Sequence, residues 1–256
     1  MSVINTNVKA MFAQSALQTN SRAMEVAMNQ LSTGKRTYSA AVDAGGLSLA
    51  EKLTSQIRGS QIAARNMNDA ISFLQTAEGA LNEIGNMAQR MFELAVQLGD
   101  GSLAAGQKTD IKAEMTELST AIGDIATNTK WNGTATKDFS VATTVSGDGT
   151  SATLAKTTAL GTTPTSASAA SAIDTYIATV TSQRAEAGAA INRLGYMVDN
   201  MNNLAANLSA SRSRIADTDY AKASAELART QIINQAATAM LAQANQQPQT
   251  VLSLLQ

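Results

Sequence analysis

The two ends of the chain are almost uncharged, and this feature constrains the fold more than any other. No Asp, Glu, Lys or Arg occurs from Thr230 to Gln256, and Lys9 is the single charged residue from Met1 to Ser21. Free ends of soluble domains are normally polar, because nothing compensates the entropy of ordering them. These two ends are instead expected to be buried against a partner.

Both ends also show a helical period. Apolar residues recur at steps of three and four from Leu17 to Leu31 and from Ile233 to Ala244, which places them on one stripe of a helix. Each end is therefore predicted to be a helix that packs against a helical partner.

Neither end is predicted to span a membrane. Gln and Asn recur through both segments, and no run of about 18 apolar residues occurs. The segment Met1–Met11 also lacks the charged and apolar regions of a cleaved secretory signal. We expect a chain that stays in the cytoplasm or leaves the cell by a route that cleaves nothing.

The composition argues against catalysis and against nucleic acid. Aromatic residues make up 4% of the chain and there are two prolines, which suits long, closely packed helices rather than a thick globular core. The absence of His and Cys removes the commonest general base, thiolate metal sites and disulfides. No Gly-rich phosphate loop occurs, and a net charge of -1 gives no basic surface. We therefore expect a protein without enzymatic activity and without cofactors.

Heptads organise the rest of the chain. An apolar seam predicts one helix from about Gly45 to Leu98, about 80 Å long at 1.5 Å per residue. Gly99–Gly101 ends it, and a second, antiparallel helix is predicted from near Thr109. A third seam, from Ile177 to Ile215, has the same period as the first and is expected to pack against it, bringing the two termini side by side. Separate core helices of a globular bundle are the alternative.

The segment from about residue 127 to 171 is rich in Thr, Ser, Gly and Ala and predicts β structure and loops. Asn132–Gly133 is a turn signal, and the stretches Phe139–Val141 and Thr153–Leu154 predict a hairpin around Ser146–Gly149. That turn lacks the further carboxylates of a calcium loop. The predicted fold is mainly α, with long antiparallel coiled-coil helices joining the N- and C-terminal segments and a small β-hairpin region between them.

Motifs at both ends resemble those of bacterial flagellins. They are Leu31-Ser-Thr-Gly-Lys-Arg36, Asp43-Ala-Gly-Gly-Leu47, Thr54-Ser-Gln-Ile-Arg-Gly59, Ser211-Arg-Ser-Arg-Ile215, Asp219-Tyr220, Leu241-Ala-Gln-Ala-Asn-Gln246 and Val251-Leu-Ser-Leu-Leu255. Together they cover roughly the first 130 and the last 80 residues.

The resemblance implies a structural subunit that self-assembles into the extracellular flagellar filament after unfolded export through the flagellar type III route. It implies three regions: a terminal coiled-coil domain of residues 1–43 plus 217–256, a helical bundle of residues 44–126 plus 172–216, and a variable region of residues 127–171. The implied partners are copies of the chain, an export chaperone at the C-terminal segment, and the filament cap and hook-junction proteins. The residues expected in the terminal coiled coil are Leu17, Met24, Met28, Leu31, Ile233, Ala237, Met240, Leu241, Leu252 and Leu255.

A second implied role concerns immune recognition. The stretch Gln89–Gln97 resembles the helix by which the vertebrate Toll-like receptor 5 detects flagellin. The residues implied in that contact are Gln89, Arg90, Glu93, Leu94, Gln97 and Glu114. The alternative is structural: the charged residues would be solvated helix faces, and Leu94 would belong to the bundle.

Two other functions compete with the filament subunit. A hook–filament junction adaptor shares the terminal helices but forms a ring rather than a long polymer. A non-polymeric coiled-coil effector or secretion-needle component would not need both terminal signatures.

Overall fold

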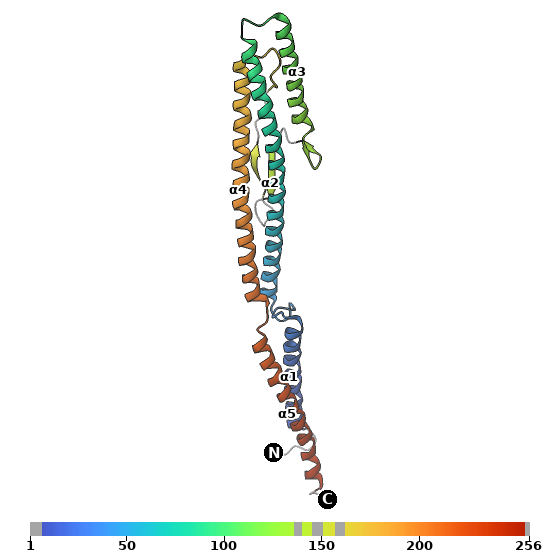
Figure 1. The fold of residues 1–256 in the computed structure, drawn as a ribbon. Coiled ribbons are helices and arrows are strands. Elements are labelled where there is room, and N and C mark those ends of the chain that lie inside the picture. Colours follow the sequence, from blue (N-terminus) through green and yellow to red (C-terminus); the bar gives the residue numbers. More distant parts are fainter. Residues whose placement is uncertain (1–6, 136–139, 145–150, 157–161, 254–256) are drawn as a thin grey trace. The chain divides into compact units, whose positions relative to one another are not determined.

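The chain is mainly α-helical. The computed structural model describes residues 7–135, 140–144, 151–156 and 162–253, and within them five helices: α1 (Val8–Thr33), α2 (Ala44–Leu98), α3 (Ala105–Asn128), α4 (Ala170–Ala216) and α5 (Tyr220–Ser253) (Figure 1). Four short strands follow α3 in the described part of the chain. Long helices with a small β region between them confirm the predicted fold class.

The helices belong to two compact units. One comprises Met1–Thr54 with Leu208–Gln256, and the other comprises Ser55–Asn207. The boundaries fall inside α2 and α4, so each of these long helices contributes residues to both units.

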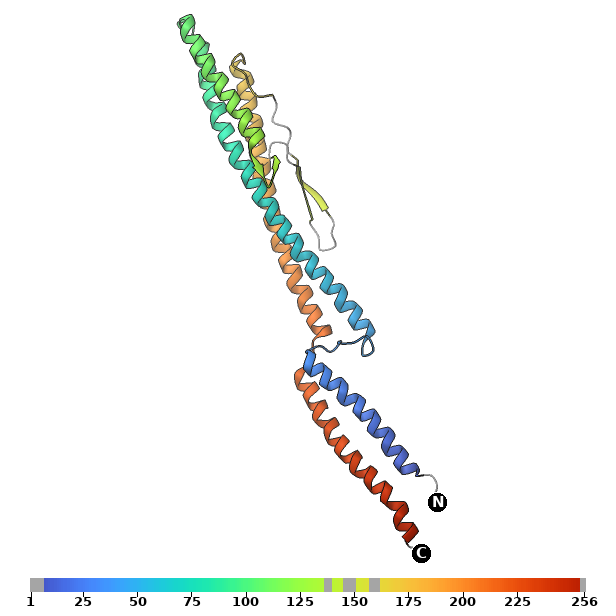
Figure 2. The same cartoon turned by 90° about the vertical axis from the view of Figure 1, so that its right-hand side faces the viewer.

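In the unit of residues 55–207, α2 and α4 run antiparallel and share two buried hydrophobic clusters (Figure 2). In the first cluster, Met67 and Leu74 of α2 pack with Leu194 and Met201 of α4. In the second cluster, further along α2, Met115 and Ile122 of α3 join the residues of α2 and α4, since α3 folds back along α2. The predicted pairing of the two long seams is confirmed, and α2 begins within one residue of the predicted start.

Helix α3 begins earlier than predicted, at Ala105 rather than near Thr109. The reason is a local cap: the backbone N–H of Ala104 donates a 3.0 Å hydrogen bond to the side-chain oxygen of Gln107. This bond satisfies the backbone N–H of the residue before the first turn. The usual capping residues, Ser, Thr, Asp and Asn, are absent from that position, so the sequence did not indicate a helix start there.

The strands form two separate antiparallel pairs. Strand β1 (Lys130–Trp131) pairs with β2 (Thr134–Ala135) around Asn132 and Gly133, whose φ angles of 48° and 81° match a type I′ turn. The ring of Trp131 packs edge-on against Phe73 of α2, with 6.0 Å between the ring centres. The predicted turn is confirmed.

The second pair joins β3 (Ser140–Thr144) to β4 (Ser151–Lys156), which confirms the predicted hairpin. The predicted turn residues Ser146–Gly149, and also Phe139, lie outside the described residues.

In the unit of residues 1–54 and 208–256, α1 and α5 lie side by side (Figures 1 and 2). The N-terminus of α1 is capped by the side chain of Asn7, which accepts a 3.1 Å hydrogen bond from the backbone N–H of Ala10. At the other end Gly34 adopts a left-handed conformation with φ 69° and ends the helix. The predicted terminal helices therefore form and pack against each other within one subunit.

Candidate functional site

The pair formed by α1 and α5 has a single antiparallel register. Lys35 lies opposite Asp217, the Asn20 side chain reaches Thr230, and the Asn7 side chain donates a 2.8 Å hydrogen bond to the carbonyl of Ala244. Successive contacts are separated by nearly equal numbers of residues on the two helices. One register therefore holds along the described length of the pair.

The buried side chains between these helices are small or polar. They are Asn20 and Ala27 on α1 and Ala223 and Thr230 on α5, each two spaced by one heptad. Small side chains at heptad positions allow two helices to approach closely. Large apolar side chains, such as Leu17 and Leu241, are only partly buried in this pair.

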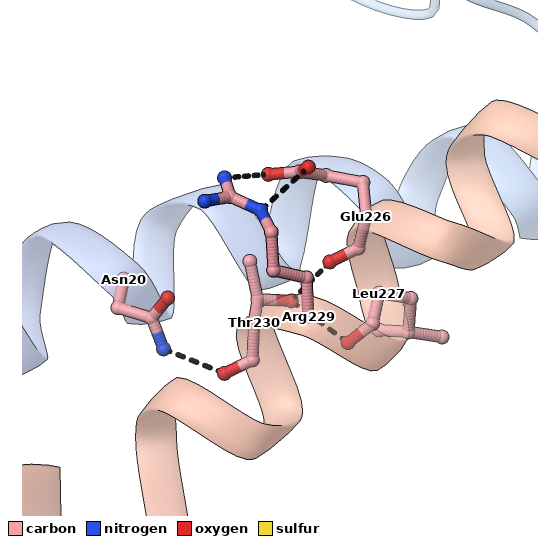
Figure 3. A network of polar contacts seen from close by, with 5 residues as sticks. All are labelled: Asn20, Glu226, Leu227, Arg229 and Thr230. Carbon is pink, nitrogen blue, oxygen red and sulfur yellow. Dashed lines mark hydrogen bonds and ion pairs between the residues drawn. The ribbon is translucent and has the colours of Figure 1, made fainter. Parts of the chain in front are cut away.

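A hydrogen-bonded polar layer lies within this interface (Figure 3). The amide of Asn20 donates a 2.7 Å hydrogen bond to the carbonyl of Thr230. The hydroxyl of Thr230 donates to the carbonyls of Glu226 and Leu227 on its own helix, each at 2.9 Å. Both buried polar side chains therefore have partners, which is the condition for burying them without a large penalty.

An ion pair borders this layer. The guanidinium of Arg229 contacts the carboxylate of Glu226 at 2.6 Å, and this hydrogen bond holds the pKa of Glu226 below its ordinary value. Both side chains are largely exposed, so the pair contributes little to stability.

Several large apolar side chains of the pair are exposed to solvent. We call them the outward apolar face. They are Val8, Met11, Phe12 and Met28 of α1 and Ile232, Ile233 and Met240 of α5. Soluble proteins seldom expose so many large apolar groups on adjacent helices unless another surface covers them.

The structure divides the residues predicted for the terminal coiled coil into two groups. Met28, Ile233 and Met240 are exposed. Leu252 lies in α5 without a described side chain, and Leu255 lies outside the described residues. The remaining members are partly buried: Leu17, Met24, Leu31, Ala237 and Leu241.

Arg36 joins two helix ends within the same unit. Its guanidinium donates two hydrogen bonds, of 3.1 and 2.8 Å, to the carbonyl of Ile215 in the last turn of α4. It also forms a 3.0 Å ion pair with Asp43, whose other oxygen accepts a 2.8 Å hydrogen bond from the N–H of Gly46 in the first turn of α2. The hydrogen bond from Gly46, and secondarily that from Arg36, holds the pKa of Asp43 below its ordinary value.

The residues predicted for receptor recognition lie in the other unit and are not all on the surface. Arg90 donates 3.0 Å hydrogen bonds to Glu114 of α3 and to Glu93 of α2, which raises the pKa of its guanidinium. Gln89 and Gln97 are exposed on the same helix. Leu94, however, is 2% exposed and packs in the core, so it lies off this surface.

The sequence did not predict the contacts made by Asn20, Thr230 and Arg36. A signal for Asn20 existed, because it interrupts a heptad of alanines between Ala13 and Ala27. Within the described residues, no helix is long and apolar enough to cross a bilayer, and no group of acidic side chains is placed to hold a metal.

Comparison with known proteins points to one family. A family model described as the bacterial flagellin N-terminal helical region matches residues 4–138, and one described as the C-terminal helical region matches residues 170–255. A flagellin of Halalkalibacterium halodurans is 41% identical, with 99% of each chain covered. A flagellar filament 33 kDa core protein of Treponema phagedenis is 37% identical over 99% of each chain, and a Bacillus subtilis flagellin is 35% identical over 98% of this chain and 99% of its own.

Proposed function

Because this chain belongs to the bacterial flagellin family, we propose that the outward apolar face of α1 and α5 is the surface through which its copies pack into the flagellar filament. The family is a structural one, and self-assembly into the filament is the function of this chain. The finer proposal concerns which residues make the contact.

One observation carries the proposal: several large apolar side chains of the terminal helices are exposed, whereas the side chains buried between the two helices are small or polar. Phe12 is 73% exposed and Met240 is 65% exposed, and both lie in the nearly uncharged stretches of residues 1–21 and 230–256. Burying such side chains against another subunit stabilises the contact between the subunits by about 1.5–3 kcal/mol for each large side chain. A helical polymer repeats this gain at every subunit.

The family membership also suggests where each region lies in the filament. We propose that residues 1–43 and 217–256 line the filament core, residues 44–126 and 172–216 form the next shell outward, and residues 127–171 face the surroundings. The chain would act outside the cell and would have no enzymatic activity.

Electron microscopy of the purified full-length protein, with filament fragments added as seeds, tests the function. Long tubes of uniform diameter are expected. Short rings despite seeding would instead indicate a hook–filament junction adaptor.

The contact surface is tested by Met240→Glu against the matched control Met240→Leu. An unpaired charge in a packed seam costs several kcal/mol, so the Glu variant should yield monomers while the Leu variant polymerises. Both variants should keep the helical circular dichroism of the parent monomer, because Met240 is exposed there. Normal filaments from Met240→Glu would show that this position lies outside the subunit contacts.

We propose that the other partners of the chain also bind the outward apolar face. An export chaperone covering α5, and the filament cap and hook-junction proteins meeting the terminal helices, would each shield the outward apolar face while a subunit is not in the filament. Competition between α5 and a peptide copy of Tyr220–Gln246 for a purified chaperone would test the first of these. No competition would place the chaperone elsewhere on the chain.

Recognition by Toll-like receptor 5 is proposed for the exposed residues Gln89, Arg90, Glu93, Gln97 and Glu114. Arg90→Ala should weaken receptor signalling by monomer without changing its fold, because the ion pairs of Arg90 are exposed. Leu94→Ala is a poor probe, since it opens a cavity in the core. Unchanged signalling by Arg90→Ala and Glu114→Ala together would refute this proposal.

A further inference from the structure

The methionines of this chain fall into two classes of exposure. Met11, Met28 and Met240 are 62%, 51% and 65% exposed, and all three belong to the outward apolar face. In the unit of residues 55–207 the methionine side chains are buried or partly buried; Met67, Met91 and Met115 are fully buried. Among the described methionines, the exposed ones therefore lie on the terminal helices alone.

We propose that Met11, Met28 and Met240 form an oxidant-sensitive site, and that their oxidation by a peroxide-class oxidant prevents free subunits from joining the filament. The susceptibility of a thioether follows its access to solvent, so these three side chains should react before the others. The chain has no cysteine, so no thiol competes for the oxidant. The effect on the filament rests on the proposed function, whereas the order of reactivity does not.

The reaction is an oxygen transfer. A lone pair on the thioether sulfur attacks one oxygen of hydrogen peroxide, the O–O bond breaks, and the departing hydroxide takes the proton to leave as water. The sulfur loses two electrons and the peroxide gains them. The product is a sulfoxide, and enzymes of the methionine sulfoxide reductase class reverse the change.

A sulfoxide at these positions opposes packing between subunits. It replaces an apolar group by a strong hydrogen-bond acceptor, and burying such a group without a donor costs free energy. Met240 stands in the uncharged stretch from Thr230 to Gln256, in which Ile232 and Ile233 are also exposed. That stretch carries no Lys or Arg that could donate a charge-assisted hydrogen bond to a buried sulfoxide oxygen.

Assembly should also protect the site. If the outward apolar face is covered in the filament, the three sulfurs become inaccessible there. Oxidation would then act on the free subunit and spare the finished polymer, so filament growth would respond to oxidants while existing filaments would not.

The test treats full-length monomer with hydrogen peroxide, locates the sulfoxides by peptide mass spectrometry and measures seeded polymerisation. We expect sulfoxides first at Met11, Met28 and Met240, and at least a tenfold rise in the concentration needed for growth. Treatment with methionine sulfoxide reductases should restore polymerisation. In filaments given the same dose, these three positions should carry at least fivefold less sulfoxide.

Substitution by leucine, which peroxide does not oxidise, separates this site from general damage. The variant Met11→Leu/Met28→Leu/Met240→Leu should polymerise normally after peroxide. The matched control Met24→Leu/Met87→Leu/Met197→Leu, which removes three partly buried methionines, should fail like the parent protein. Because a triple substitution could itself disturb packing, Met240→Leu alone is measured beside it and should show partial resistance.

Two results would overturn the inference. One is equal loss of polymerisation by the triple-leucine variant and the parent; the other is normal growth of parent monomers that carry all three sulfoxides. Equal oxidation of the three positions in filaments and monomers, with normal growth of the untreated protein, would instead contradict the proposed contact surface.

Discussion

Tyr176 of α4 carries a buried hydroxyl whose removal should stabilise the protein. Its side chain is 5% exposed in the core shared by α2, α3 and α4, and its hydroxyl has no hydrogen-bond partner among the described residues. A buried hydroxyl without a partner costs about 1–3 kcal/mol. Tyr176→Phe keeps the ring and removes the hydroxyl, so it should raise the free energy of unfolding by about 1 kcal/mol or more.

The same residue should make stability depend on alkaline pH. Burial raises the pKa of Tyr176 to about 12, against 10.0 in the unfolded chain. A raised pKa means that stability is fully present below about pH 10 and falls as the pH rises toward 12, since the unfolded state loses its proton first. Each pH unit in that window removes about 1.4 kcal/mol, or about 2–3 kcal/mol in all.

Urea unfolding of the full-length monomer, followed by circular dichroism from pH 7 to 12, measures both effects. The matched control is Tyr196→Phe, because Tyr196 lies on the same helix and is 77% exposed. The control should follow the parent at every pH, whereas Tyr176→Phe should be more stable at pH 7 and lose less stability above pH 10. Destabilisation by Tyr176→Phe would refute the reasoning and show that the hydroxyl has a partner.

Three further perturbations concern the unit of the terminal helices. Arg36→Met keeps the aliphatic stem but removes both hydrogen bonds to the carbonyl of Ile215. It should lower the free energy of unfolding by about 1 kcal/mol in thermal unfolding. An unchanged unfolding midpoint would show that water replaces the guanidinium. Since the pKa of Asp43 is lowered, its contribution is present at neutral pH and is lost as the pH falls below about 3.8, so Asp43→Asn should be less acid-sensitive than the parent in a circular dichroism titration. Asn20→Ala removes the hydrogen bond to Thr230 and should cost about 0.5–1.5 kcal/mol in the same assay, and no loss would mean that the polar layer is dispensable.

Much of the fold could be read from the sequence because its long helices repeat one pattern. The seam from Met67 to Leu98 and the seam from Ile177 to Ile215 both follow heptad spacing, mostly in steps of three and four, and residues on both are buried in shared clusters. The turn at Asn132–Gly133 was equally readable, because few residues other than Asn and Gly tolerate positive φ at both positions.

The orientation of the terminal helices was not readable in the same way. Hydrophobic periodicity finds an apolar stripe, but it does not tell whether that stripe meets the other helix of the subunit or a second subunit. Ile233 and Met240 are predicted for the coiled coil and are exposed in the single subunit, where Ala223 is buried. Leu94 shows a different limit of motif matching. The motif assigned it to a receptor contact, but Leu94 is buried in the core beside the heptad residue Met91.

The meeting of α1 with α5 has a consequence for quality control. The two helices stand at opposite ends of the sequence, so the close interface around Asn20 and Ala27 exists only in a chain that also carries Tyr220–Ser253. A chain broken off before that point would leave the inner surface of α1 uncovered and would present half of the outward apolar face. Addition to a growing polymer would thereby act as a check on chain length, admitting full-length copies and rejecting truncated ones without any separate proofreading factor.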